Sequence, residues 1–310
     1  MSQPSSDPAI SEGRAAPAAR PSRVVAAAPW VFVLLWSSGF VVARYAMEDA
    51  GPLVFLAVRL AIAAALLAVI AAAVGAARPS RSQTGWSIVV GILFHALYLG
   101  GVFVAISWGL AAGISALISG VHPVLTAVLG VVLLRELLTG RQWLGVALGF
   151  VGVLVVVADK LGGTDAGLTR GTLIASIVSV IGMSAGTLVQ RRFGATTPLL
   201  WGTSVQYVGA AAVLGVAALV HDGEHFTVTR QSSFAMAWAL VVLSIAAVLL
   251  MLWLLQREEA ARVSSLFFLT PALSAAEAAV LFDERLGPLA LAGLVISLVG
   301  VALTVRSSSG

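Results

Sequence analysis

Ten apolar stretches, most of them about 20 residues long, follow one another along this chain of 310 residues. A helix needs about 20 residues to cross the ~30 Å hydrocarbon layer of a bilayer. Apolar residues make up 59% of the chain and charged residues only 10%, whereas a soluble domain is about a quarter charged. The sequence therefore predicts an all-α polytopic membrane protein with ten transmembrane helices. They cover roughly residues 26–46, 53–75, 86–108, 112–134, 141–158, 170–190, 198–220, 234–255, 262–282 and 288–305.

Basic residues lie unevenly in the loops between these stretches. Twelve fall on the side that holds the N-terminal tail and five on the other side. Under the positive-inside rule, this asymmetry predicts a cytoplasmic-membrane protein with both termini in the cytoplasm. It also explains the net charge of +4 without a nucleic-acid partner. The twelve are Arg14, Arg20, Arg23, Arg78, Arg81, Arg135, Arg141, Arg191, Arg192, Arg257, Arg262 and Arg306, and the five are Arg44, Lys160, Arg170, Arg230 and Arg285.

An internal duplication divides the chain into two copies. The region 116–157 recurs 148 positions later without a gap, so that Pro123 matches Pro271 and Glu136 matches Glu284. Each copy holds five helices, an odd number, and the second copy is therefore expected to be inverted in the membrane. Inverted repeats are typical of alternating-access carriers, which bind substrate near the midplane between the repeats. Further pairs are Thr126/Ser274, Gly145/Gly293, Gly149/Ser297 and Gly152/Gly300, and, at an offset of 147, Ser37/Ser184, Gly39/Gly186, Arg44/Arg191 and Arg59/Gln206.

This duplication predicts the division of the chain. Residues 1–26 form a cytoplasmic N-terminal tail, 27–158 the first repeat, 159–169 an external linker, 170–305 the second repeat, and 306–310 a cytoplasmic C-terminal tail. The first tail is rich in proline, alanine, serine and arginine and has no apolar periodicity. Such a segment cannot build a core, so we expect it to be disordered.

The residues of both copies resemble a known family. The run 35–40 (LWSSGF), Arg59, and the segment from Pro123 through Leu134-Arg135-Glu136-Leu137 to 141–145 (RQWLG) are similar to the EamA repeat of the drug/metabolite transporter superfamily. This resemblance implies a ten-helix bundle around a central cavity that exports or exchanges small metabolites, such as amino acids, or drugs. The usual Gly-Glu elbow of the family differs here, because Arg135 and Asp283 precede the two glutamates.

Glu277 is the most informative polar residue inside a predicted span. A charge at the centre of a bilayer costs about 2.5–3.5 kcal/mol on insertion scales, so a charged residue there is expected to have a functional or structural role. Thr270 and Ser274 share its helix face and match His122 and Thr126 of the first copy. We hypothesise that Glu277 binds a proton or a substrate amine in the cavity. The alternative is a structural, protonated Glu277 that is hydrogen-bonded to a neighbouring helix.

Two histidines lie in predicted spans as well. His95 and Tyr98 are three residues apart, hence on one helix face, and His95 could join Glu277 in a proton relay or contact a substrate carboxylate. Packing is an equally open reading. His122 precedes Pro123, where a proline-broken helix can expose a carbonyl to a ligand. The other candidate cavity residues are Trp36, Ser37, Ser38, Ser179, Met183, Thr187 and Gln190.

Arg59 lies near the external end of its predicted helix. An arginine in this position usually extends to the interface or pairs with a loop carboxylate, here Glu48 or Asp49, so we favour a structural role over binding of an anionic substrate. We likewise assign Glu136 and Glu284 to helix capping or to ion pairs between loops.

Small residues recur along the helices at 141–158 and 288–305. Small residues four apart let helices approach closely, within one chain or between two, which leaves a homodimer open. Thr139 and Gln142 fit a capping box at the start of the first of these helices. The residues predicted to pack are Gly145, Gly149, Gly152, Gly293, Ser297 and Gly300.

These patterns favour a secondary active transporter that exports a small metabolite or drug by alternating access. Proton coupling and uncoupled facilitation or exchange are both open. The chain lacks a phosphate-binding P-loop, and it has no cysteine for a thiolate metal site. A membrane-embedded enzyme would need His95, His122 and Glu277 to converge, and no His-Glu-x-x-His motif supports it. The histidines of the loop at 221–225 fit a solvated loop better than a metal site. We predict no cofactor and no metal; the expected partners are a small-molecule substrate and the lipid bilayer.

Overall fold

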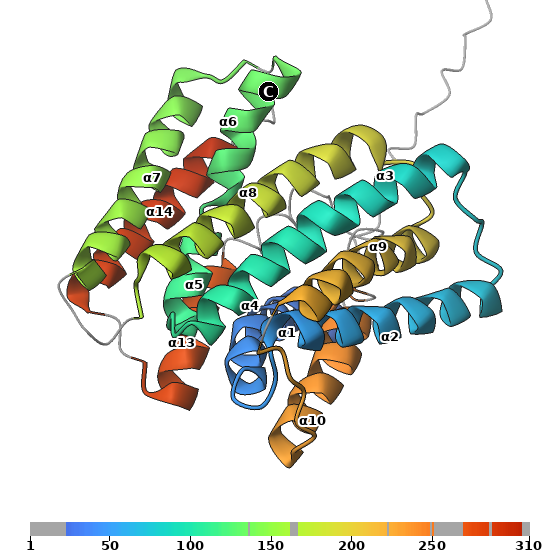
Figure 1. The fold of residues 1–310 in the computed structure, drawn as a ribbon. Helices are drawn as coiled ribbons and strands as arrows, with labels where there is room; N and C mark the ends of the chain where they lie inside the picture. The colour runs from blue at the N-terminus through green and yellow to red at the C-terminus, as the bar shows by residue number, and fades with distance from the viewer. Residues whose placement is uncertain are drawn as a thin grey trace, which may run out of the picture.

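The computed structural model describes residues 23–135, 137–161, 167–221, 223–248, 250, 269–284 and 287–305. Within these residues the chain forms helices and no strand, apart from an isolated β-bridge between Ala50 and Phe226. Figure 1 shows the helices packed in a bundle. They are α1 (Arg23–Ala46), α2 (Pro52–Ala73), α3 (Arg81–Gly91), η1 (Ile92–Leu99), α4 (Gly100–Ser107), α5 (Ala112–Ser119), α6 (His122–Leu134), α7 (Gly140–Leu161), α8 (Arg170–Phe193), α9 (Leu199–Val220), α10 (Arg230–Trp238), η2 (Ala239–Ala246), α13 (Thr270–Phe282) and α14 (Pro288–Val305).

Several helical stretches are long and apolar enough to cross a bilayer. There are six of these among the described residues: Ala27–Ala46, Pro52–Ala73, Arg81–Ser107, Ala112–Leu133, Arg170–Phe193 and Leu199–Val220. Shorter apolar helices are Gly140–Val156, Arg230–Ala246, Thr270–Phe282 and Pro288–Leu303. The prediction of an all-helical membrane protein is confirmed in this coarser form. The count of ten spans and their inversion stay predictions, in part because residues 251–268, where two predicted helices end and begin, lie outside the described residues, as do Glu136, Arg285 and most of both tails.

The helix predicted at 112–134 is interrupted. α5 ends at Ser119 and α6 begins at His122, with Pro123 in its first turn. Proline suits that turn, because the first N–H groups of a helix have no acceptor within it. The predicted span is present, from Ala112 to Leu133, and it is broken next to Pro123, where the sequence suggested a break or a kink.

α6 and α13 begin and end alike, 148 positions apart. α13 also opens with a proline in its first turn, Pro271 after Thr270. α6 is followed by Arg135 with a φ of 57° and α13 by Asp283 with a φ of 54°. Left-handed backbone of this kind favours glycine, because a Cβ crowds the following carbonyl. Both copies thus have a backbone that favours glycine at the position before the elbow glutamate, although neither has a glycine there.

Two π-helical segments also occupy equivalent positions. η1 continues α3, which starts at a capping box of Ser80 and Gln83, five residues before the predicted helix at 86–108. η2 continues α10 and lies 147 positions after η1. A π-helix bonds each N–H to the carbonyl five residues earlier, and it is frequently found at functional sites. The same irregularity in both copies therefore directs attention to the region between η1 and η2.

α7 and α14 pack closely along each other (Figure 1). A Cβ placed on Gly152 would lie 2.6 Å from the carbonyl oxygen of Gly293, and one on Gly300 would collide with the backbone of Gly149. Ser297 is buried at the same interface. The predicted capping box at the start of α7 is confirmed, because the Thr139 N–H donates to the side chain of Gln142 over 2.9 Å and the Gln142 N–H donates to the hydroxyl of Thr139 over 3.3 Å.

Two loops from different copies are bonded together at one end of the bundle. The loop between α1 and α2 donates the Gly51 N–H to the carbonyl of His225, in the loop between α9 and α10, over 2.8 Å. Glu224 of the second loop accepts from the first-turn N–H groups of Leu53 and Val54 on α2, over 3.4 and 2.9 Å. α2 and α9 also pack along each other. Elements of the two copies are therefore interleaved in the bundle.

Candidate functional site

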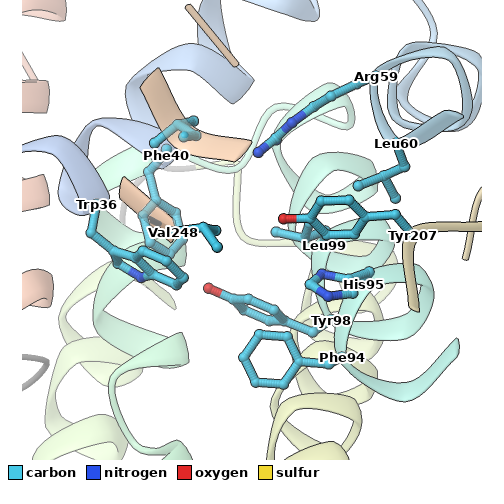
Figure 2. A pocket seen from close by; sticks show the side chains of 12 residues that line it. Trp36, Phe40, Arg59, Leu60, Phe94, His95, Tyr98, Leu99, Tyr207 and Val248 are labelled. Atoms are coloured by element: carbon cyan, nitrogen blue, oxygen red, sulfur yellow. The ribbon is translucent and has the colours of Figure 1, made fainter. Parts of the chain in front are cut away.

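A cavity lies between α1, α2, η1, α9, η2 and the residues after η2 (Figure 2). The space open to the centre of a water molecule is about 70 Å³, which is room for several waters or for part of a small ligand. Elements of both copies contribute to its wall. The lining residues are Trp36, Gly39, Phe40, Arg59, Leu60, Phe94, His95, Tyr98, Leu99, Tyr207, Leu243 and Val248.

Arg59 is part of this wall, and only 6% of its surface is exposed. Its Nε donates to the hydroxyl of Ser244 on η2 over 3.3 Å. The expectation that Arg59 extends to the interface or pairs with a loop carboxylate is wrong. Glu48 accepts instead from Gln231 over 2.6 Å, and Asp49 from the hydroxyl of Thr229. The N-terminus of α10 thus binds both carboxylates, through Gln231 in its first turn and through its N-cap Thr229, and Arg59 points inward instead.

Two tyrosine hydroxyls point into the same space as the guanidinium of Arg59. Figure 2 shows the hydroxyls of Tyr98 and Tyr207 and the guanidinium all directed towards the side of the cavity that Trp36 and Phe40 form. Both tyrosines are buried. No aspartate or glutamate is among the residues found to line the cavity in the described part of the chain. The cavity therefore combines one fixed positive charge with two hydroxyl groups.

Hydrogen bonds between the copies hold this polar wall. The bond from Arg59 joins α2 of the first copy to η2 of the second. Gln206, which matches Arg59 at the offset of 147, lies 3.4 Å from Nε2 of His95 and so joins α9 of the second copy to η1 of the first. The ring of His95 stands edge-on to Tyr207, with ring centroids 4.7 Å apart. Each copy thus supplies a polar residue that contacts the π-helix of the other copy.

Glu277 lies in a second polar cluster, between α1 and α13. Its Oε1 is 2.6 Å from the hydroxyl of Ser37, and the hydroxyl of Ser274 donates to the Ser37 carbonyl over 2.9 Å. Oε2 of Glu277 and the hydroxyl of Thr270 are buried and have no hydrogen-bond partner among the described residues. Neither Glu277 nor Ser37 lines the cavity, but Trp36, the neighbour of Ser37, does.

The predicted residues on α6 and α8 lie away from the cavity. The carbonyl of His122 accepts from Thr126 over 2.8 Å and from Ser184 over 3.0 Å, so the break before α6 does not leave it free for a ligand. Nδ1 of His122 is 3.2 Å from the carbonyl of Ser119. Ser184 matches Ser37 at the offset of 147, and each serine contacts the proline-started helix of the other copy.

The remaining predicted wall residues also have partners within the protein. The hydroxyl of Thr187 donates to the carbonyl of Met183 over 2.7 Å, and the Met183 side chain is buried in the core. Ser38 accepts from Nε1 of Trp238 over 2.9 Å. His95, His122 and Glu277 do not meet in one site. In the described residues no group of three or more histidine, cysteine or acidic side chains could hold a metal ion.

Of the predicted site residues, the structure brings Trp36, His95 and Tyr98 together in the cavity. It adds Arg59 and Tyr207, which the sequence analysis assigned elsewhere or did not consider. The sequence does contain a feature that points to both residues. Gln206 is the repeat partner of Arg59, and Tyr207 follows it directly, so the matched pair marks two walls of one site.

Comparisons with known proteins agree with this architecture. The family model of the EamA-like transporter family matches residues 27–158 and 170–306. A probable amino-acid metabolite efflux pump of Escherichia coli is 25% identical over 88% of this chain and 92% of its own length. A pump of the same description from Salmonella typhimurium is 26% identical over the same shares. Uncharacterized transporter YvbV of Bacillus subtilis is 25% identical over 89% of this chain and 90% of its own.

A solved crystal structure shares the fold, with a TM-score of 0.64 over 93% of this chain and 100% of the other, at 18% identity. The family match extends over both copies of the duplication, and it confirms the resemblance seen in the two elbows and their flanking helices. The chain therefore belongs to the EamA-like transporter family and is an integral membrane transporter.

Proposed function

We propose that this protein is a secondary active transporter that exports a small metabolite, an amino acid or a similar compound, across the cytoplasmic membrane. In this proposal ten transmembrane helices form two inverted repeats, both termini are cytoplasmic, and the cavity opens alternately to either side. The observation that carries it is the cavity itself, which is lined by equivalent elements of both copies. The names of the Escherichia coli and Salmonella relatives, probable amino-acid metabolite efflux pumps, support the substrate class and the direction.

Glu277 is the proposed coupling group, and its hydrogen bonds support that role. The hydroxyl of Ser37 lies 2.6 Å from Oε1 of Glu277 and 3.0 Å from the carbonyl of Leu34. A serine has a single hydroxyl hydrogen, which it can donate to only one of these oxygens. Both bonds form at once when Glu277 carries a proton and donates it to Ser37, while Ser37 donates to Leu34. The buried Oε2, which has no partner in the described part of the chain, agrees with a neutral acid, because a buried charged oxygen without donors is costly.

Loss of that proton would change the attachment of α1 to α13. An ionised Glu277 would compete with the Leu34 carbonyl for the Ser37 hydrogen, at a position one residue from Trp36 in the cavity wall. Proton release and the shape of the cavity are therefore linked through α1. This link is the physical basis that we propose for proton coupling.

The test is substrate-driven proton movement in proteoliposomes that contain the purified protein. Pools of amino acids, of carboxylic acids including amino acids with a blocked amino group, and of cationic drugs are compared for wild type, Glu277→Gln and Glu48→Gln. The first substitution keeps the shape of the side chain and one acceptor but removes the proton that can be released, whereas Glu48 is exposed and provides a matched control. We expect one pool to evoke proton flux that Glu277→Gln abolishes and Glu48→Gln retains.

Two other outcomes would change the proposal. Substrate flux without proton movement, unchanged in Glu277→Gln, would make Glu277 structural and the protein a facilitator or an exchanger. Substrate flux in no pool, with the protein correctly folded, would contradict the proposed substrate classes.

A further inference from the structure

We propose that the cavity selects a carboxylate compound with a net negative charge and an apolar body, and that Arg59, Tyr98 and Tyr207 bind its carboxylate. The inference rests on the proposed function, because it takes this cavity as the transport site. It narrows the substrate, within the amino acids and similar compounds of that proposal, to organic monoanions. Such compounds are amino acids with a blocked amino group, or carboxylic acids that lack one.

The first argument is the unused hydrogen-bonding capacity of Arg59. A guanidinium carries five N–H donors and no acceptor. Only Nε has a partner, Ser244, so the four N–H donors of the two terminal nitrogens have no acceptor among the described residues. No carboxylate of the described chain pairs with Arg59, although only 6% of the residue's surface is exposed. A buried cation needs a counter-charge, and a ligand carboxylate provides one in the two-pronged geometry that a guanidinium favours.

The second argument is the convergence of donors. The hydroxyls of Tyr98 and Tyr207 point into the same space as the guanidinium (Figure 2). The Tyr98 hydroxyl borders the cavity and makes no hydrogen bond to a described residue. The guanidinium and the Tyr98 hydroxyl offer donors without acceptors, and the Tyr207 hydroxyl, which also contacts Ser244, borders the same space. This set suits a carboxylate with its four acceptor positions.

The third argument concerns the charge of the rest of the ligand. A substrate ammonium would need a carboxylate or several acceptors, and no acidic side chain is among the lining residues that the structure describes. Arg59 would also repel it. Trp36, Phe40 and Phe94 instead offer aromatic surfaces, which suit an apolar body. A free amino acid could therefore place its ammonium only against an aromatic face, which is a weaker interaction than an ion pair.

The test is a binding series in which the apolar body is constant and the charge varies. The purified full-length protein in detergent is titrated with 3-phenylpropionate, phenylalanine, 3-phenylpropan-1-ol and 3-phenylpropylamine. We expect 3-phenylpropionate to bind at least tenfold more tightly than the amine or the alcohol, with phenylalanine between them. Arg59→Gln should remove this preference. Arg78→Gln should retain it, because Arg78 lies outside the cavity, over the ring of Trp201.

The outcomes separate this inference from the proposed function. Equal binding of the anion and the amine by wild type overturns the inference, even if proteoliposomes export a metabolite. Unchanged binding of 3-phenylpropionate by Arg59→Gln also overturns it. Preference for the anion that depends on Arg59, without flux of any compound, supports the binding site and contradicts transport. If Arg59→Gln does not fold, the charge series on wild type and on Arg59→Lys, which keeps the charge but loses the two-pronged geometry, decides instead.

Discussion

The contact between α7 and α14 allows a worked prediction for Gly152→Ala. The added Cβ would lie 2.6 Å from the carbonyl oxygen of Gly293 and 2.7 Å from the Cα of Ser297. The backbone N of Ser297 would be closer still, and ordinary contact of a Cβ begins at 3.4 Å, so the two helices must separate by about 1 Å. All three neighbouring atoms belong to the backbone and cannot rotate away as a side chain would.

That separation weakens the whole interface. Gly300 approaches the backbone of Gly149 one to two turns away, and this contact loosens together with that of Gly152. Overpacking of this kind costs about 1–3 kcal/mol. Because the obstruction is backbone and the displacement extends along both helices, we expect a loss of about 2 kcal/mol in the free energy of unfolding.

The assay is thermal unfolding of the purified protein in detergent, followed by tryptophan fluorescence. Gly152→Ala should lower the melting temperature by several degrees. Gly85→Ala is the matched control, since a Cβ on this glycine of α3 meets nothing within 4 Å. Alanine favours a helix by up to about 1 kcal/mol over glycine, so this variant should melt at the same temperature or slightly above. Unchanged melting of Gly152→Ala would refute the close approach of α7 and α14.

Three further predictions use other features. Glu284→Ala removes acceptors for the N–H groups of Ala112 and Gly113 at the start of α5, at 3.1 and 3.0 Å, and should cost about 1–2 kcal/mol in the melting assay, whereas Glu284→Gln should cost less. Arg135→Gly relieves a positive φ of 57° and should raise stability by up to about 1 kcal/mol; a decrease would contradict the left-handed elbow. Tyr207→Phe should weaken binding of 3-phenylpropionate by about three- to tenfold and leave binding of 3-phenylpropylamine unchanged, measured by the same titration.

Apolar length was sufficient to predict the helices, and the motifs at 35–40 and 134–145 to predict the family, because both can be read from short stretches of sequence. Pro123 marked the break before His122, but the sequence alone did not distinguish a break from a kink, because a proline can also kink a helix that continues. The π-helical segments have no local signature. Their recurrence at an offset of 147 becomes visible only in the structure.

Arg59 could not be placed from its own surroundings. Its distance from the end of α2 suggested the interface, and Glu48 and Asp49 were the nearest acidic residues in sequence. Both accept hydrogen bonds from residues about 180 positions away, Gln231 and Thr229. Long-range contacts of this kind decide which polar side chains are bound within the protein and which face the cavity. In the sequence, only the repeat pairing of Arg59 with Gln206 pointed to a position of Arg59 in the cavity wall.

The bond between the loops at Gly51 and His225 bears on how the protein moves. It fastens the α1–α2 hairpin to the α9–α10 hairpin, and α7 with α14 joins the copies again at another place in the bundle. The two copies are therefore not two separate bodies in this bundle. Each rigid body that moves during a transport cycle would contain helices of both repeats. A search for the axis of motion should begin with these mixed pairs of hairpins, and a cross-link between the halves need not stop transport.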